Sequence, residues 1–214
     1  MSGYGKIIDC LAESINPLVW SMRMFESRMF LKIGAGKLKG RTFDGPKGGK
    51  TVRPISDRVK EALFDILAAK FDDAIVLDLF TGTGAIAFEA LSRGAKKVVC
   101  VEHDRRNVML IKKNAEDLTI LDQISVLHGP LPAHLKKVKG VFDLIFMDPP
   151  FALDIAEELF PMIAKQNLLQ TGGTIILQRD RRSKTLVSDH FVLAREHRVG
   201  DSILHFYQHL EEVK

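Results

Sequence analysis

Cysteine is scarce in this chain of 214 residues, which has only Cys10 and Cys100. The two are not in a C-x-x-C spacing, and Cys100 lies within an apolar run, so we expect a buried, reduced thiol. The seven histidines show no H-E-x-x-H spacing. His205 and His209 are four apart, but they fall in a stretch of period 2, where that spacing is not one helix face. The sequence therefore predicts no metal site.

Long apolar runs are also lacking. None reaches the length that spans a membrane, and Asp9, Glu13 and Asn16-Pro17 interrupt the first residues, which argues against a signal peptide. We therefore expect a cytoplasmic protein that does not bind a membrane. The hydrophobic content of 46% is sufficient for a full core, and α/β sheets of this size commonly form one domain.

Residues 1–28 differ from the rest of the chain. Apolar residues between Ile7 and Ile15 have partial helical spacing, which Pro17 ends. We expect an extension without a catalytic role, either disordered or folded loosely onto the domain. A partner-binding amphipathic helix is the alternative.

Positive charge is concentrated between Lys32 and Lys60. Nine cations there face only Asp44 and Asp57, giving 9 − 2 = +7, whereas the whole chain carries +4. The nine are Lys32, Lys37, Lys39, Arg41, Lys47, Lys50, Arg53, Arg58 and Lys60. Because this segment is Gly-rich with short strand-like runs, we predict a basic β-hairpin arm over residues 29–53 that grips nucleic-acid phosphates. An ordinary solvated face is the alternative.

A glycine-rich turn follows an apolar run of strand length that ends near Asp78. Gly82 and Gly84 allow a tight turn and let a ligand approach main-chain N–H groups at a helix N-terminus. The next expected strand ends in Glu102, 20 residues after Gly82, at the offset where an acid takes ribose hydroxyls in a βαβ unit. The pattern predicts a nucleoside-containing cofactor.

The tetrapeptide Asp148-Pro149-Pro150-Phe151 ends a second apolar run, which begins at Val141. Prolines fix the backbone and leave the preceding carbonyls free to accept, so an acceptor group and an aromatic ring are held together. Such a clamp suits a flat ring that carries an amino group. A strand ending in a Pro-Pro turn with a surface aromatic is the alternative.

The glycines alone fit a nicotinamide enzyme as well as a methyltransferase, because Gly82-x-Gly84-x-x-Ala87 matches the dinucleotide fingerprint. Asp78 favours the methyltransferase. Its carboxylate, four residues before Gly82, would repel a pyrophosphate but could accept from the ammonium of a methionine-like group.

Taken together, these motifs resemble those of the bacterial 16S ribosomal RNA guanine-N2 methyltransferases. The resemblance runs from about Met29 to the C-terminus and rests on Leu77-Asp-Leu-Phe-Thr-Gly-Thr-Gly84, Glu102, Asp148-Pro-Pro-Phe151 and the more family-specific block from Arg53 to Phe64. It implies methyl transfer from S-adenosyl-L-methionine to the N2 amine of a guanine in 16S rRNA or an assembling small ribosomal subunit, by a probable monomer. The chain departs from the family pattern at His128-Gly129-Pro130 and at Gln178.

The resemblance and the motifs together assign candidate residues. Catalysis falls to Asp148, Pro149, Pro150 and Phe151. Cofactor binding falls to Asp78, Phe80, Thr81, Gly82, Thr83, Gly84, Glu102, His103 and Gly129. RNA binding falls to Lys37, Lys39, Arg41, Arg53, Arg58, Arg181 and Arg182.

Residues 54–214 are expected to form the catalytic domain, an α/β doubly wound, mostly parallel sheet of Rossmann-like type. Helices are predicted from Ser56, over 85–93, over 104–118 and over 154–165, and they alternate with strands at Ile75, Val98, Ile124, Leu144 and Ile175. A terminal hairpin is predicted around Gly200-Asp201. The resemblance implies seven strands, the last antiparallel.

Three other functions remain open at this point. An amino-methyltransferase acting on another RNA or on DNA would use the same clamp. A nicotinamide-dependent oxidoreductase shares the glycine fingerprint. A non-catalytic RNA-binding module would use the basic arm alone.

Overall fold

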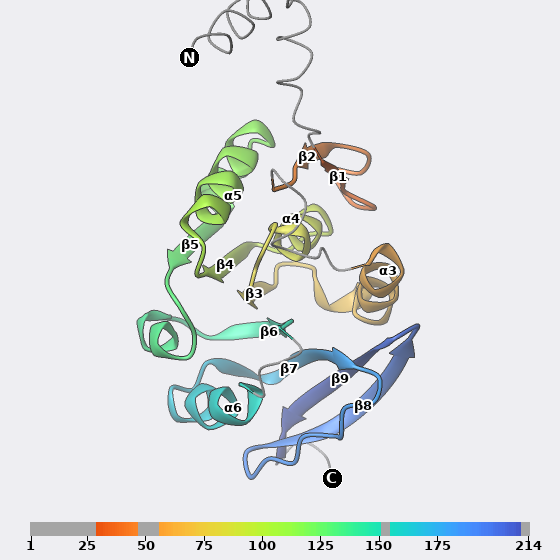
Figure 1. Ribbon diagram of the computed structural model, residues 1–214, viewed down its shortest axis with the longest axis vertical. Coiled ribbons are helices and arrows are strands. Elements are labelled where there is room, and N and C mark those ends of the chain that lie inside the picture. The colour runs from red at the N-terminus through yellow and green to blue at the C-terminus, as the bar shows by residue number, and fades with distance from the viewer. Residues whose placement is uncertain (1–28, 47–55, 151–154, 211–214) are drawn as a thin grey trace, which may run out of the picture.

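A twisted sheet with strand order β5-β4-β3-β6-β7-β9-β8 runs through the computed structural model (Figure 1). The structure describes residues 29–46, 56–150 and 155–210. Within these ranges the seven strands are β3 (Ile75–Leu79), β4 (Lys97–Glu102), β5 (Ile124–His128), β6 (Phe142–Met147), β7 (Leu169–Asp180), β8 (Phe191–Val199) and β9 (Ser202–His209). Strands β3 to β7 are parallel, and β9 lies antiparallel between β7 and β8. This arrangement confirms the predicted doubly wound sheet.

Helices cover both faces of the sheet. They are α3 (Asp57–Ile66), α4 (Ala85–Ser92), α5 (Arg105–Asp117) and α6 (Ala156–Lys165), with short 3-10 turns at Ala68–Lys70, Leu121–Gln123 and Ala133–Lys137. Apolar residues of α3, α4 and α5 share one core cluster with Val76, Leu144 and Ile176 of the sheet. Those of α6 form a second cluster on the other face. Among the described helices, none is long and apolar enough to cross a membrane.

Local sequence signals explain where these elements begin. The Ser56 hydroxyl caps α3 by accepting from the Val59 N–H at 3.3 Å, as expected of an N-cap serine. The helices expected over 85–93 and 104–118 appear as α4 and α5, and the last begins at Ala156. The hairpin expected around Gly200-Asp201 is formed by β8 and β9. Cys100 is buried with no disulfide, as predicted, whereas Cys10 lies outside the described residues.

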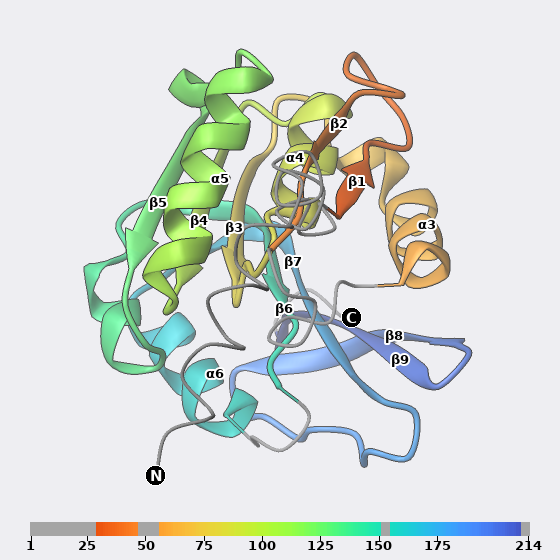
Figure 2. The ribbon, with the colours of Figure 1, turned by 45° about the horizontal axis from the view of Figure 1, so that its top comes forward.

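A two-stranded hairpin of β1 (Phe30–Lys32) and β2 (Thr42–Asp44) packs against α4 and α5 (Figure 2). Its residues Ile33 and Phe43 belong to the core cluster of α3, α4 and α5. The approach to α4 is close: a Cβ at Gly36 would lie 1.9 Å from the Ser92 carbonyl oxygen. The hairpin therefore shares the core of the catalytic sheet, and the boundary expected at residue 53 lies outside the described residues.

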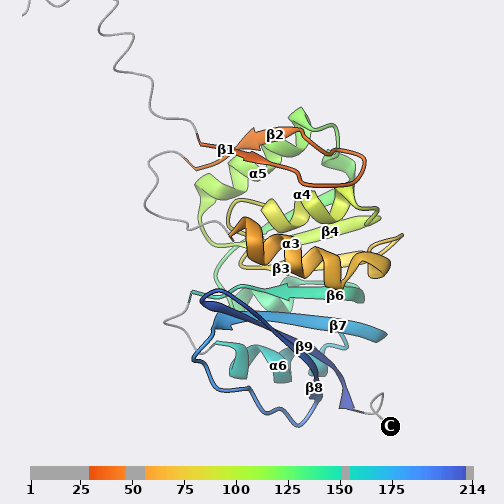
Figure 3. The same cartoon turned by 90° about the vertical axis from the view of Figure 1, so that its right-hand side faces the viewer.

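The hairpin turn lies at the amino edge of the sheet. Lys37 N–H donates to the carbonyl of Ser92, the last residue of α4, at 2.7 Å. Helix α4 starts at the carboxyl edge, directly after β3 and its loop, so its end marks the opposite edge. Figure 3 shows the turn at one side of the domain and the arrowhead of β6 at the other.

Candidate functional site

Asp78 is a buried carboxylate near the carboxyl end of β3, with 4% of its surface exposed. Its Oδ2 atom has no hydrogen-bond partner. Burial raises the pKa of Asp78 well above its usual range, and the negative charges of Asp148 and Glu102 raise it further. A buried carboxylate with a free oxygen and two acidic neighbours would be stabilised by a cationic group on a ligand.

The loop after Asp78 turns through three residues with positive φ. Phe80 has φ +66°, Gly82 +58° and Gly84 +82°. A non-glycine residue in this region is uncommon and marks a backbone that its surroundings hold in place. Gly84 begins α4, and a Cβ there would lie 2.9 Å from the Phe88 ring. The main chain can therefore approach the helix closely while its first N–H groups stay available to a ligand.

Thr81 and Thr83 complete this loop, and both side chains are buried. The Thr81 hydroxyl donates to the Asp78 carbonyl at 2.8 Å, which ties the turn to the end of β3.

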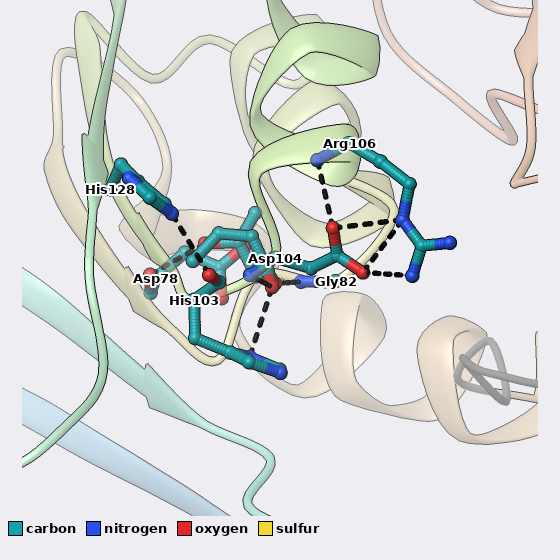
Figure 4. Close-up of polar contacts among 8 residues, drawn as sticks. Asp78, Gly82, His103, Asp104, Arg106 and His128 are labelled. Carbon is teal, nitrogen blue, oxygen red and sulfur yellow. Dashed lines mark hydrogen bonds and ion pairs between the residues drawn. The ribbon is translucent and has the colours of Figure 1, made fainter.

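Glu102 binds the same loop from β4 (Figure 4). Its Oε2 accepts from Gly82 N–H at 2.8 Å and its Oε1 from Asp104 N–H at 2.7 Å, while His103 Nδ1 lies 3.1 Å from Oε1. Only 3% of Glu102 is exposed. The structure thus gives Glu102 a loop-positioning role, and its predicted contact with ribose hydroxyls stays a prediction.

The remaining cofactor candidates lie beside Glu102. The His103 carbonyl is hydrogen-bonded to His128 Nε2 at 3.0 Å, and Gly129 N–H donates to the Glu102 carbonyl at 2.9 Å. Figure 4 shows His103 and His128 on the same side of the glycine loop. His103 is exposed and could meet a ligand there.

Asp148 follows β6 and is held in a largely buried position. Burial raises the pKa of Asp148 to about 6. Pro149 is buried, Pro150 is exposed, and Phe151 lies outside the described residues, so the stacking role expected of it stays a prediction.

Asp78, Asp148 and Gln178 extend from one face of the sheet. Alternate side chains of a strand share a face, and the residues two positions earlier, Val76, Phe146 and Ile176, all lie in the core cluster of α3, α4 and α5. The three polar residues therefore lie along the carboxyl edge of β3, β6 and β7, where open α/β sheets bind ligands. The glycine loop, the unpartnered Asp78 oxygen and the neighbouring acids together fit a nucleoside ligand that carries an ammonium and a sulfonium.

Part of the predicted RNA-binding set also lies at the carboxyl edge. Arg58 is exposed in the first turn of α3, and Arg181 and Arg182 are exposed in the loop that leaves β7. Arg182 pairs with Asp180, Nε to Oδ1 at 2.9 Å, so part of its charge is already compensated. Arg53 lies outside the described residues.

Three other RNA-binding candidates lie on the hairpin turn at the amino edge. Arg41 donates to the carbonyls of Leu118 and Asp117 at the end of α5, at 3.2 and 2.7 Å. Lys37 Nζ donates to Gln123 Oε1 at 3.2 Å, and Lys39 is exposed. These cations lie roughly 20 Å from the carboxyl edge, because the 13 residues of α5 rise about 1.5 Å each. An RNA that touched them and Asp148 together would have to extend along the whole depth of the domain.

Comparison with known proteins identifies the family. The model of the family described as "Conserved hypothetical protein 95" matches residues 31–208. A ribosomal RNA small subunit methyltransferase D of Haemophilus influenzae is 32% identical over 83% of this chain and 93% of its own length. Its namesake in Escherichia coli K12 is 30% identical over 83% of this chain and 89% of its own length. A solved putative methyltransferase of Escherichia coli superposes with a TM-score of 0.75 at 29% identity, covering 85% of this chain and 98% of that one.

This chain belongs to the small-subunit ribosomal RNA methyltransferase family. Membership confirms the family, the enzyme class and the cofactor that the motifs predicted. It also contradicts the nicotinamide oxidoreductase that the glycine fingerprint alone left open. Within the described part of the chain, no group of His, Cys, Asp and Glu side chains could hold a metal ion.

Two functional features of this methyltransferase were missed at the level of sequence. Gln178 was expected at the carboxyl edge but was not assigned to the site, although 92% of its surface is buried and its Oε1 has no hydrogen-bond partner. Glu89, buried in α4, accepts from the N–H groups of Gly34 and Ala35 and holds the hairpin. The available signal in each case was a polar residue within an apolar run.

Proposed function

We propose that this methyltransferase transfers a methyl group to the exocyclic N2 amine of a guanine in 16S rRNA. The observation that carries the proposal is Asp148, a largely buried carboxylate fixed before two prolines at the carboxyl edge, next to the negative charge of Asp78. A side chain in that position can accept hydrogen bonds from an amine. The choice of guanine N2 rests on family resemblance.

The chemistry required of the protein is positioning of a weak nucleophile. The lone pair of an aryl amine is delocalised into its ring, so acceptors for its two N–H hydrogens favour a more tetrahedral nitrogen. The Asp148 carboxylate and the Pro149 carbonyl would supply these acceptors. S-adenosyl-L-methionine, when bound, supplies a methyl group already activated by a sulfonium. Orientation of the amine therefore supplies much of the rate.

Asp148 also has a suitable affinity for a proton. With a pKa of about 6, its carboxylate is mostly ionised at neutral pH and can take the proton that the amine loses on methylation. The Asp78 carboxylate would accept from the cofactor ammonium, and the amides near Gly82 and Gly84 would approach its nucleoside part. Glu102 would meet the ribose hydroxyls with the lone pairs that the loop leaves free.

The substrate would be 16S rRNA or an assembling small subunit, bound by a monomer in the cytoplasm. Arg58, Arg181 and Arg182 lie nearest the proposed target position, and Lys37, Lys39 and Arg41 would bind phosphates of a distant RNA segment. Extruding a base costs a few kcal/mol from a duplex and least from a loop, which favours an exposed guanine.

The test is Asp148→Ala, measured for methyl transfer to small subunits that lack the modification and for S-adenosylhomocysteine affinity by calorimetry. We expect transfer to be lost while the cofactor affinity stays largely intact, because the carboxylate acts on the target amine. Asp122→Ala, at an exposed position in the 3-10 turn before β5, is the matched control. A folded Asp148→Ala protein that transfers methyl groups at the wild-type rate would refute the proposal.

A further inference from the structure

Gln178 is the polar residue of the carboxyl edge whose hydrogen-bonding capacity is least used. It lies one position beyond Leu177, which pairs with Met147, and it pairs with the buried Leu204 of β9. Ile176, Leu204 and Phe206 surround its face of the sheet as parts of one apolar cluster. Its Oε1 is buried and has no hydrogen-bond partner in the described structure.

An unpaired carboxamide oxygen among apolar side chains costs free energy, because burial removes water without supplying another donor. A leucine or methionine would fill this position without that cost. A partner is therefore expected from outside the chain, and the only polar face open to Gln178 is the one it shares with Asp148. Adjacent strands lie about 4.8 Å apart, so both side chains can reach one planar ligand.

We propose that the Gln178 carboxamide reads the Watson–Crick edge of the target guanine, pairing with N1–H and O6 while Asp148 holds the N2 amine. This assignment rests on the proposed function and extends it to base selection. The N2, N1 and O6 groups of guanine stand in one row, as Asp148 and Gln178 do on their neighbouring strands. The oxygen of the carboxamide accepts from N1–H and its nitrogen donates to O6, so one side chain satisfies both.

The pairing explains how a target amine on guanine is distinguished from other amines. Adenine and cytosine each present an exocyclic amine flanked by a ring acceptor, whereas guanine N2 is flanked by the N1–H donor. A carboxamide oxygen next to Asp148 therefore accepts from guanine and meets an acceptor on the other bases. A polar group left unpaired in a buried site gives strong discrimination.

The experiment compares two substrates and four proteins. The substrates are a small-subunit RNA fragment with its methylated guanine intact and the same fragment with 2-aminopurine at that position, which keeps the 2-amino group and lacks N1–H and O6. The proteins are wild type, Gln178→Leu, Gln178→Met and the control Gln170→Leu, at an exposed position on the same strand. Calorimetry with S-adenosylhomocysteine shows that each protein is folded and binds its cofactor.

With wild type and Gln170→Leu, we expect kcat/KM to fall about 10- to 100-fold on replacing guanine by 2-aminopurine, as two hydrogen bonds are lost. Gln178→Leu and Gln178→Met should lose a similar factor on guanine and lose little more on 2-aminopurine, since each change removes the same pairing. Cofactor affinity should not move.

The outcomes separate the two proposals. If wild type methylates guanine N2 but the Gln178 variants retain its full preference for guanine over 2-aminopurine, Gln178 only packs and the base-reading assignment is overturned. If the wild-type product is another nucleoside, the proposed function itself fails, and this is seen before any variant is measured.

Discussion

Asp148 combines a functional position with an electrostatic cost. Burial raises its pKa to about 6 from an ordinary value of 3.8, so the carboxylate is less favourable in the folded protein than in the unfolded chain. Between these two values the native state holds a proton that the unfolded state has released. Stability therefore falls as pH rises from about 4 to about 6 and then stays reduced.

Asp148→Asn should remove this cost. We expect the variant to be more stable than wild type at pH 7 by about 2–3 kcal/mol, which is the free energy of a shift of roughly two pKa units, and to lose its advantage near pH 4. Urea denaturation at pH 4 and pH 7 measures the difference. Equal stabilities at pH 7 would show that Asp148 is well solvated, and the raised pKa would then be wrong.

Glu102 tests the cofactor side of the site. Glu102→Ala should weaken S-adenosylhomocysteine binding by about 1–3 kcal/mol, because it removes a charged acceptor for the ribose and for the Gly82 N–H. Calorimetry on the folded variant gives the value. Glu116→Ala, at an exposed position on α5, serves as the control. Unchanged affinity in Glu102→Ala would remove Glu102 from the site.

At the scale of elements, the N-terminal hairpin is held by a buried acid. Glu89 accepts from Gly34 N–H at 2.7 Å, from Ala35 N–H at 3.0 Å and from Arg93 Nε at 2.9 Å, with 1% of its side chain exposed. Arg93 in turn lies over the Phe64 ring, with its Cζ 4.8 Å from the centroid. Glu89 thus connects the hairpin, α4 and α3.

Glu89→Ala should lower the free energy of unfolding by about 3–5 kcal/mol, as expected when one partner of a buried ion pair is removed and two backbone donors lose their acceptor. Equilibrium urea unfolding measures it, with Glu61→Ala as an exposed control on α3. A loss below about 1 kcal/mol would mean that the hairpin is held by Ile33 and Phe43 alone.

The sequence predicted elements whose signals are local. Alternating and apolar runs identified the strands at Ile75 and Leu144, and Ser56 identified the start of α3. It could not predict that the hairpin docks on α4, because that contact depends on Glu89 meeting backbone groups 55 residues away. The use of Arg41 was hidden for the same reason: its guanidinium binds carbonyls at the end of α5, where a helix dipole favours a cation.

The site was predicted as far as its motifs are contiguous. The glycine loop, Asp78 and Asp148 lie at one edge because the carboxyl ends of parallel strands meet there. The buried, unpartnered state of Gln178 could not be read from sequence, because it depends on Leu204 of β9 lying opposite.

At the scale of the whole molecule, positive charge lies at both edges of the sheet. Lys37→Glu combined with Lys39→Glu should reduce the slope of log affinity against log salt by up to about 2, since each lost phosphate contact releases fewer counterions. Arg41 is left intact because it holds α5. Lys139→Glu with Lys165→Glu, two exposed positions outside the hairpin, provides the same change of charge as a control. A full salt slope in the hairpin variant would make the amino-edge cations an ordinary solvated face.

The most direct test of the central claim is transfer of labelled methyl from S-adenosyl-L-methionine to small ribosomal subunits that lack the modification, followed by nucleoside analysis of the 16S rRNA. We predict one labelled nucleoside, N2-methylguanosine, formed by wild type and absent with Asp148→Ala. Label in another nucleoside, or equal labelling by the two proteins, would contradict the account.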